Sequence, residues 1–346
     1  MPFLKQFSVL FLGATGYVGG TLLVELVKAY PQARLTVLLR SSTHDETIKA
    51  LDAERIEIVH ASLPDDRAVI VQCASQADVV FNCTDADNIQ LVQALLEGMR
   101  KPGSSSKPVL IHTSGTQLVM DDAEGNFKED SKAFSDMVED DILRIPSTAP
   151  HRDVDDLIFE ADKKGDISAC IIAPSLIWGF GSGPVKKNSM IFQFFVRLAK
   201  AFRRGFVIGE GTALAGTVHV QDVVSLHLLV LARALAGDDL DVSSYAKFYF
   251  ASTRDATFRE ILTSLASFFH SKAHPGFESA ALQSVPFEET VKVHPYAYLV
   301  ARSRYVKAER GRTIGWTPKY VEERMTDEEN MFPLLEAALA QVELEE

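Results

Sequence analysis

Short apolar runs alternate with amphipathic stretches along the first half of the chain. The runs are nearly solid blocks of apolar residues, which is typical of strands that are buried on both faces. They predict strands at Phe7–Leu12, Arg34–Leu39, Ile56–Val59, Asp78–Asn82 and Val109–Thr113. Between them lie stretches of helical periodicity, the clearest of which spans Ile89–Met99. Regular alternation of this kind predicts a parallel sheet with helices on both of its faces.

The alternation continues with a helix at His151–Lys164 and a strand at Ile167–Ala173, and then becomes less regular. The remaining pattern predicts helices and one strand at Ser189–Arg203, Gln221–Ala236, Lys247–Ala251 (the strand), Phe258–Phe269 and Thr326–Val342. We therefore expect an α/β fold in which a doubly wound parallel sheet carries a smaller mixed C-terminal lobe. The expected division falls at residue 180, with elements of 181–346 crossing back to the core of 1–180.

Two segments lack periodicity. Lys101–Lys107 is rich in serine and predicts a flexible surface loop. Asp121–Asp141 is rich in acidic residues, and its pattern favours a solvated surface loop over a lid.

The segment from Gln6 to Val24 contains no charged residue, so a signal peptide and a membrane span both need consideration. Several glycines interrupt it, and its apolar period changes from that of a strand to that of a helix, which favours a strand, a turn and a helix. The net charge of −12 and pI near 5.3 disfavour nucleic acid and anionic membranes as partners. Three widely spaced cysteines predict a reducing, cytoplasmic location and no metal site.

The glycine-rich turn Gly13–Gly19 (GATGYVG) stands between the first strand and the first helix. Turns without side chains let the backbone approach a pyrophosphate, which the N–H groups and dipole of a helix N-terminus attract. We therefore predict an NAD(P)-binding Rossmann domain, although a tight turn that serves packing alone is the alternative. The predicted contacts at this turn are Gly13, Thr15, Gly16, Tyr17, Val18 and Gly19.

The end of the second strand bears on the choice of coenzyme. An acidic residue there would bind the ribose 2′-hydroxyl of NAD, but the position holds Arg40. Because a guanidinium matches the oxygens of a 2′-phosphate, we expect NADP(H) to be favoured over NAD(H). The alternative is a solvated arginine at a strand end.

Five motifs occur in an order and spacing that resemble the extended short-chain dehydrogenase/reductase superfamily, near its atypical NmrA-like and epimerase/dehydratase-like branches. They are the glycine turn, HTSGT at His112–Thr116, APSLIWGFGSGP at Ala173–Pro184, VHVQDV at Val218–Val223 and IGWTP at Ile314–Pro318. The resemblance covers nearly the whole chain. It implies that Ser114 or Thr116 bonds the reacting oxygen and that the backbone near Pro174 and Ile177 meets the nicotinamide. It also brings Thr84 close to the coenzyme.

The resemblance fails at the family's Y-x-x-x-K, where a Tyr donates the proton and a Lys assists it. At the start of the corresponding helix, His151 stands in the Tyr position and Asp155 in the Lys position. In the functional interpretation the carboxylate orients the imidazole, since the two are one helical turn apart. In the structural interpretation Ser147 or Thr148 caps the helix and the acids complement its dipole.

Weaker candidates follow the sixth strand. Lys186, Lys187 and Asn188 could meet substrate or pyrophosphate oxygens, although a solvated surface is the commoner role. Four phenylalanines suggest either an apolar substrate wall or ordinary core, namely Phe192, Phe194, Phe195 and Phe202. His219 is expected to be a packed structural histidine.

Three functions remain open from the sequence. The first is an NADP(H)-dependent oxidoreductase that moves hydride between nicotinamide and a small-molecule carbonyl or alcohol. The second is a non-catalytic NADP(H)-binding redox sensor of the NmrA-like kind, and the third is an isomerase or dehydratase without net redox change. A small molecule is the expected partner, and helices that flank the sheet are compatible with a homodimer.

Overall fold

The computed structural model describes residues 6–100, 107–128, 130–238 and 242–345. Its largest element is a seven-stranded sheet with the order β11-β7-β5-β4-β1-β2-β3, in which every neighbouring pair is parallel. The strands are β1 (Phe7–Leu12), β2 (Ala33–Leu39), β3 (Ile56–His60), β4 (Val79–Asn82), β5 (Val109–Thr113), β7 (Ser168–Pro174) and β11 (Phe248–Ala251). The predicted parallel α/β sheet is therefore confirmed.

The strands were predictable because both faces of the sheet are covered. In β1, Val9 and Phe11 point into one apolar core while Leu10 and Leu12 point into another. Helices α3 (Arg67–Gln76), α4 (Ile89–Met99) and α6 (Arg152–Lys163) contribute to the core on one face. Helices α1 (Tyr17–Ala29) and α8 (Val220–Ala236) pack on the other.

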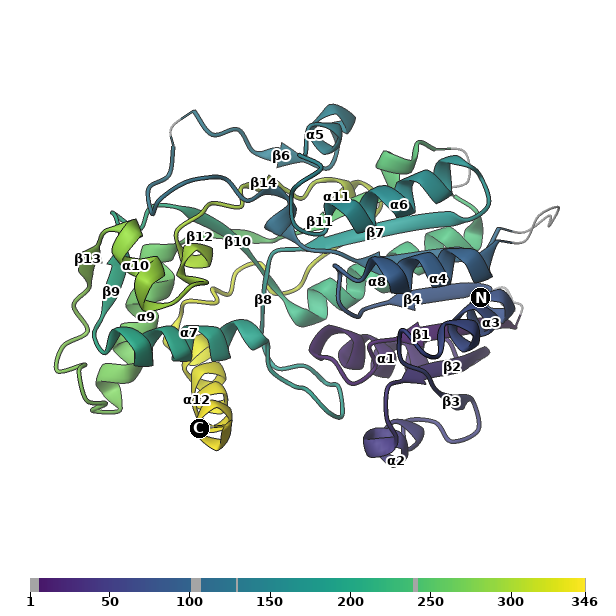
Figure 1. Cartoon of the computed structure of the whole chain (residues 1–346), viewed down its shortest axis with the longest axis horizontal. Coiled ribbons are helices and arrows are strands. Elements are labelled where there is room, and N and C mark those ends of the chain that lie inside the picture. The colour runs from purple at the N-terminus through teal and green to yellow at the C-terminus, as the bar shows by residue number, and fades with distance from the viewer. Residues whose placement is uncertain (1–5, 101–106, 129, 239–241, 346) are drawn as a thin grey trace.

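A second lobe occupies the left of Figure 1, and the large sheet occupies the right. The lobe contains a sheet of β8 (Leu176–Trp178), β10 (Leu214–His219) and β12 (Arg254–Thr257), and a pair formed by β9 (Phe206–Ile208) and β13 (Gln283–Val285). Helices α7 (Met190–Phe202), α9 (Phe258–Ser271) and α12 (Glu328–Glu345) enclose its core, beside the short α10 (Phe287–Val293). Strand β11 follows β10 in the chain but pairs with β7 in the large sheet.

Two of the C-terminal motifs bind each other. The carboxylate of Asp222, at the start of α8, accepts hydrogen bonds from the backbone N–H groups of Lys319 and Tyr320, at 2.7 and 3.1 Å. The indole of Trp316 donates to the Asp222 carbonyl oxygen at 3.1 Å. Asp222 of VHVQDV is therefore bonded to Trp316 of IGWTP and to the two residues that follow this motif, and these bonds hold the C-terminal segment against α8.

The acidic segment at 121–141 is largely an irregular loop with most of its acidic residues exposed, as its composition favours, but it is anchored at one point. It contributes β6 (Phe134–Ser135), which pairs with β14 (Val306–Lys307), and part of the short α5 (Glu139–Leu143). Asp136 is fully buried, and its carboxylate accepts hydrogen bonds from three backbone N–H groups, those of Phe250, Glu309 and Arg310. An acidic residue in a sequence usually indicates a solvated position, but here three backbone N–H groups supply the donors that permit the burial of Asp136. The loop predicted at Lys101–Lys107 lies almost wholly outside the described residues.

Within the described residues, no helix is both long enough and apolar enough to span a membrane.

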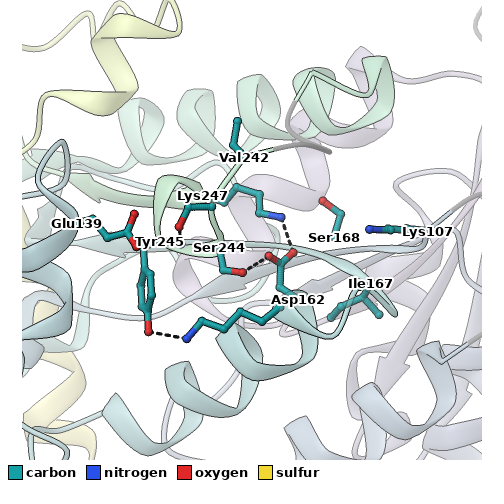
Figure 2. A pocket seen from close by; sticks show the side chains of 12 residues that line it. Lys107, Glu139, Asp162, Ile167, Ser168, Val242, Ser244, Tyr245 and Lys247 are labelled. Atoms are coloured by element: carbon teal, nitrogen blue, oxygen red, sulfur yellow. Dashed lines mark hydrogen bonds and ion pairs between the residues drawn. The ribbon is translucent and has the colours of Figure 1, made fainter.

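A cavity of about 430 Å³ opens at the amino end of β7, where α6 ends. Figure 2 shows the buried group that forms one of its walls: Asp162 pairs with Lys247 at 2.5 Å and accepts a hydrogen bond from Ser244. The backbone N–H of Ala169 also donates to Asp162, at 2.8 Å. In doubly wound folds ligands bind at the carboxyl ends of the strands, so this cavity lies at the opposite edge from the expected site. We therefore assign Asp162, Lys247 and Ser244 a role in stabilising the fold rather than in catalysis.

We expect Asp162→Asn to lower the free energy of unfolding by about 3–5 kcal/mol, because it leaves the buried ammonium of Lys247 unpaired. Urea unfolding of both proteins measures the difference. Asp166→Asn is the matched control, since its ion pair with Arg100 at 3.5 Å is partly exposed and contributes at most about 1 kcal/mol. Equal losses in the two variants would contradict a stabilising role for the buried pair.

Candidate active site

The glycine turn brings β1, α1 and the end of β4 into direct backbone contact. Gly13 has a φ of +91°, and a Cβ atom built on it would overlap the carbonyl oxygen of Cys83. A Cβ atom on Gly19 would likewise overlap the carbonyl oxygen of Gly13. Both positions therefore require glycine. The turn lies between the carboxyl ends of β1 and β4, where the strand order reverses and where such folds bind ligands.

The first turn of α1 presents backbone N–H groups that face no competing acid. Its N-cap is Gly16, which supplies no side-chain hydrogen bond, whereas Asn88 and Ser189 cap α4 and α7 with their side chains. Free N–H groups and the positive end of the helix dipole together favour a bound anion. The surrounding residues are half-buried: Thr15, Gly16, Tyr17 and Val18.

The loop after β8 is fastened onto this turn. The Tyr17 hydroxyl donates a hydrogen bond to the carbonyl oxygen of Gly179 at 2.5 Å, and burial raises the pKa of Tyr17 above its ordinary value. Farther along the loop, a Cβ atom on Gly183 would overlap the backbone of Gly20, and a Cβ atom on Gly20 would overlap the carbonyl oxygen of Ala14. The sequence placed Tyr17 at the pyrophosphate but did not reveal this contact with the lobe.

Arg40 lies at the carboxyl end of β2 and is exposed, as are Ser41 and Ser42. Asp45 is the nearest acid along the chain, and its carboxylate is bonded to His60 at 2.9 Å. A guanidinium and several hydroxyls thus stand at the edge where the adenosine ribose would lie.

A buried polar pair that includes a carboxylate lies just beyond the carboxyl end of β5. Ser114 Oγ lies 2.9 Å from Asp155 Oδ2, and both side chains are buried. Desolvation by burial raises the pKa of Asp155 to about 8, against the lowering effects of Ser114 and of Arg152. Thr116 is also buried and begins a short 3-10 helix just beyond. The structure therefore brings Ser114 and Asp155 into direct contact.

His151 and Asp155 do not pair through their side chains, contrary to the functional interpretation of the sequence. His151 Nδ1 instead lies 2.7 Å from Asp87 Oδ1, on the loop after β4. The reason is geometric: His151 is the N-cap of α6 and has a left-handed backbone, which turns its side chain away from the helical face that carries Asp155. The structural interpretation is also wrong about the cap, because neither Ser147 nor Thr148 occupies that position.

His151 has a left-handed backbone with a φ of 68°, which is uncommon for a residue other than glycine. This conformation costs about 1–2 kcal/mol. Asp87 holds it in place, since Asp87 Oδ1 also accepts from the His151 backbone N–H at 2.9 Å. The imidazole packs on Gly115, with Nε2 3.3 Å from the position a Cβ atom would take there. Strain held by a specific partner points to a functional position.

Sequence reasoning missed Asp87, Asn82 and His112. Asn82 Nδ2 and His112 Nδ1 lie 3.1 Å apart beneath the site, and both side chains are fully buried. All three stand at or just beyond the carboxyl end of a predicted strand, and that position was the signal available in the sequence. Asn82 and His112 looked like ordinary strand residues because their neighbours in the sequence are apolar, whereas Asp87 lies in a polar loop.

The structure places the remaining candidates in different surroundings. Thr84 follows β4 and bonds to Asn82, while Pro174 ends β7 and Ile177 lies in β8, so these three stand at the expected edge. Lys186 and Lys187 are exposed. His219 caps α8 and stacks on Tyr320, as expected for a structural histidine. The core interpretation of the phenylalanines is confirmed, since the lobe core contains Phe192, Phe195 and Phe202, with Phe194 packed against it.

Fold and site together define a nicotinamide-dinucleotide enzyme built on a Rossmann sheet. The family model described as "NAD dependent epimerase/dehydratase family" matches residues 9–243, so the chain belongs to that family.

Among curated proteins, the chain is similar to the oxidase ucsJ of an Acremonium species, with 23% identity over 88% of this chain and 91% of that protein. It is also 23% identical to the Arabidopsis thaliana 3beta-hydroxysteroid-dehydrogenase/decarboxylase isoform 2, over 77% of this chain and 45% of that longer protein. Among solved structures, dTDP-glucose 4,6-dehydratase from Bacillus anthracis, in complex with NAD, shares the fold. The TM-score is 0.64 at 15% identity, over 97% of this chain and 99% of the other.

These likenesses confirm the resemblance to extended short-chain dehydrogenases/reductases and the expectation of an NAD(P)-dependent enzyme. A nicotinamide dinucleotide is the coenzyme class of the family. The residues present fit it, since the uncapped first turn of α1 and the side-chain-free approach at Gly13 and Gly19 suit a pyrophosphate.

The raised pKa of Asp155 predicts a measurable effect of pH on stability. The folded protein keeps this proton up to about pH 8, whereas the unfolded chain releases it near 3.8. Between these values the folded state binds more protons, so raising the pH lowers the free energy of unfolding. As the pH rises from 4 to 8, we expect the free energy of unfolding of Asp155→Asn to increase relative to that of wild type by more than about 1 kcal/mol.

Urea unfolding across this pH range measures the difference. Asp153→Asn is the control, because Asp153 lies on the same helix but is exposed. A constant difference between Asp155→Asn and wild type at every pH would contradict the raised pKa.

Proposed function

We propose that the protein is an NADP(H)-dependent oxidoreductase that transfers hydride between the nicotinamide and a small-molecule carbonyl or alcohol. The observation that carries the proposal is the Ser114–Asp155 contact at the end of β5, beside the His151–Asp87 pair and next to the dinucleotide turn. An enzyme that interconverts a carbonyl and an alcohol must bind the oxygen and manage one proton, and these groups do both.

When bound, the reduced coenzyme would supply the hydride, which carries the two electrons of the reduction. The backbone of α1 holds its pyrophosphate, and Pro174 and Ile177 line the nicotinamide edge. Ser114 donates a hydrogen bond to the reacting oxygen. His151, held by Asp87, exchanges protons with water, because its side chain is 13% exposed and that of Asp87 is 57% exposed. The substrate lies beneath the C-terminal lobe.

The preference for NADP(H) rests on Arg40. Its exposed guanidinium ends β2 next to Ser41 and Ser42, and the carboxylate of Asp45 is bonded to His60. A 2′-phosphate would therefore meet a cation and two hydroxyls.

We expect Arg40→Ala to weaken NADPH binding by about 10- to 100-fold, since a charge-assisted hydrogen bond contributes about 1.5–3 kcal/mol. NADH binding should change little. Fluorescence titration of both reduced coenzymes measures the two affinities. Arg34→Ala, an exposed arginine near the other end of β2, is the matched control and should change neither. Equal losses for NADPH and NADH, or a wild-type preference for NADH, would refute the role of Arg40.

Incubation of wild type with NADPH and a panel of carbonyl compounds should consume coenzyme. His151→Asn should lower turnover at least about tenfold while leaving NADPH affinity unchanged, because asparagine tolerates the left-handed backbone but transfers no proton. Unchanged turnover in His151→Asn would remove His151 from the mechanism.

The family name also includes chemistry without net redox change. Product formed from a substrate without net loss of NADPH would replace the proposed oxidoreductase by an isomerase or dehydratase. Tight binding with neither consumption nor product would instead favour a redox sensor.

A further inference from the structure

A chain of buried polar side chains runs beneath the site from the end of β4 to the start of α6. Its first member is Asn82, whose amide orientation is fixed by Thr84. Asn82 Oδ1 lies 2.6 Å from Thr84 Oγ1 and 3.3 Å from the backbone nitrogen of Thr84. A backbone N–H can only donate, so the oxygen of the Asn82 amide must face Thr84 and its NH₂ group must face His112.

The orientation of Asn82 fixes the tautomer of His112. Asn82 Nδ2 donates to His112 Nδ1 at 3.1 Å, so the imidazole carries its proton on Nε2. Burial lowers the pKa of His112 to about 3, and the ring is therefore neutral at ordinary pH. His112 thus offers one N–H donor, aimed away from Asn82.

That donor faces an acceptor that it does not reach. His112 Nε2 lies 3.8 Å from Asp155 Oδ1, and neither atom has a hydrogen-bond partner among the described residues. Both side chains are at most 1% exposed. A buried carboxylate would draw a neutral N–H donor into a full hydrogen bond, since an unmet buried charge is costly. The open contact fits a neutral, protonated carboxyl group.

The other charges around Asp155 do not neutralise it directly. The guanidinium of Arg152 pairs with Asp156 at 3.0 Å and donates to the carbonyl oxygen of Ile142 at 3.1 Å. Asp153 and Asp156, on the same helix, oppose ionisation of Asp155, and Arg152 favours it. On the neighbouring strand, His112 is neutral. On the neighbouring loop, Asp87 bonds the His151 imidazole, so His151 does not pair with Asp155. Ser114 is the group that bonds Asp155 Oδ2.

We propose that Asp155 is the proton store of the site, acting through Ser114, and that His112 is the positioning residue that stabilises Asp155 once it ionises. The inference rests on the proposed function. In the direction of reduction, the substrate carbon receives hydride and the electron pair of the C=O bond moves onto oxygen. That oxygen takes the Ser114 hydroxyl proton, and Ser114 Oγ takes the proton of Asp155 Oδ2. Asp155 is left as a carboxylate, and His112 Nε2–H closes onto its second oxygen.

His151, which exchanges protons with water, later restores the proton to the site, and oxidation of the alcohol runs the same steps in reverse. Because Asp155 occupies the Lys position and His151 the Tyr position of Y-x-x-x-K, this relay gives the chain a source for the proton that the missing tyrosine would donate.

Carboxyl carbon NMR of the protein without coenzyme tests the store directly. The protein is labelled with ¹³C at the aspartate carboxyl carbons, and the Asp155 signal is the one lost in Asp155→Asn. We expect its titration midpoint to lie well above the ordinary value. His112→Leu should raise the midpoint by at least about half a pH unit, because it removes the donor that stabilises the charged form. His227→Leu is the matched control, since it removes another fully buried imidazole that bonds to Thr113 instead.

Two further measurements on wild type do not depend on how well the leucine variant folds, and the second can be extended to that variant. Imidazole ¹⁵N NMR of wild type should show His112 as the Nε2-protonated neutral tautomer. The kcat of carbonyl reduction should fall as the pH rises through the Asp155 midpoint, and His112→Leu should move this limb upward by the same shift.

The inference is overturned if Asp155 titrates in the ordinary range, if His112 carries its proton on Nδ1, or if His112→Leu leaves the Asp155 midpoint unchanged. Each of these results counts against it even if carbonyl reduction proceeds. If wild type reduces no carbonyl while the NMR results hold, the proposed function fails and the proton store loses its reaction. The two failures are therefore distinguishable.

Discussion

The arrangement of the site depends on one point of backbone contact, where the first turn of α1 meets the carboxyl ends of β1 and β4. Gly13 and Gly19 permit it, since any side chain at either position would overlap a carbonyl oxygen. This contact sets the height of α1 above the sheet, and so places its free N–H groups beside the ends of β4 and β5. The buried apolar blocks of β1, β4 and β5 hold the strands in register beneath it. Ser114 follows β5 on one side of this contact, and Arg40 follows β2 on the other.

The fold was predictable because it follows from local patterns. Solid apolar blocks such as Phe7–Leu12 need burial on both faces, and a parallel sheet between two helical layers supplies it. The turn at Gly13–Gly19 was predictable because its glycines are forced by sterics alone. The acidic segment at 121–141 was predictable as a largely exposed loop, but the burial of Asp136 was not, because it depends on donors at Phe250, Glu309 and Arg310, which are distant in sequence. Composition carries no information about such partners.

The candidate site, like the fold, could be predicted from the sequence only in part. Ser114 and Asp155 could be proposed from position, but their contact joins residues 41 apart in the chain. The partner of His151 could not be foreseen, because helical spacing pointed to Asp155, whereas the left-handed N-cap turns the imidazole toward Asp87. Buried His112 looked like a strand residue until its neighbours were known. The polar residues of the candidate site are therefore spread over β4, β5 and α6, and no single sequence motif contains them all.

Calorimetric titration of the coenzyme-free protein with NADPH tests the central claim most directly, which is that the backbone of the first turn of α1 binds a coenzyme pyrophosphate. We expect saturable binding of one molecule per chain. Val18→Pro should weaken it strongly, since proline removes one N–H yet is tolerated in a first helical turn, while Val18→Ala should not. Absence of saturable heat with NADPH, NADP⁺, NADH and NAD⁺ alike, or equal binding by Val18→Pro and wild type, would contradict it.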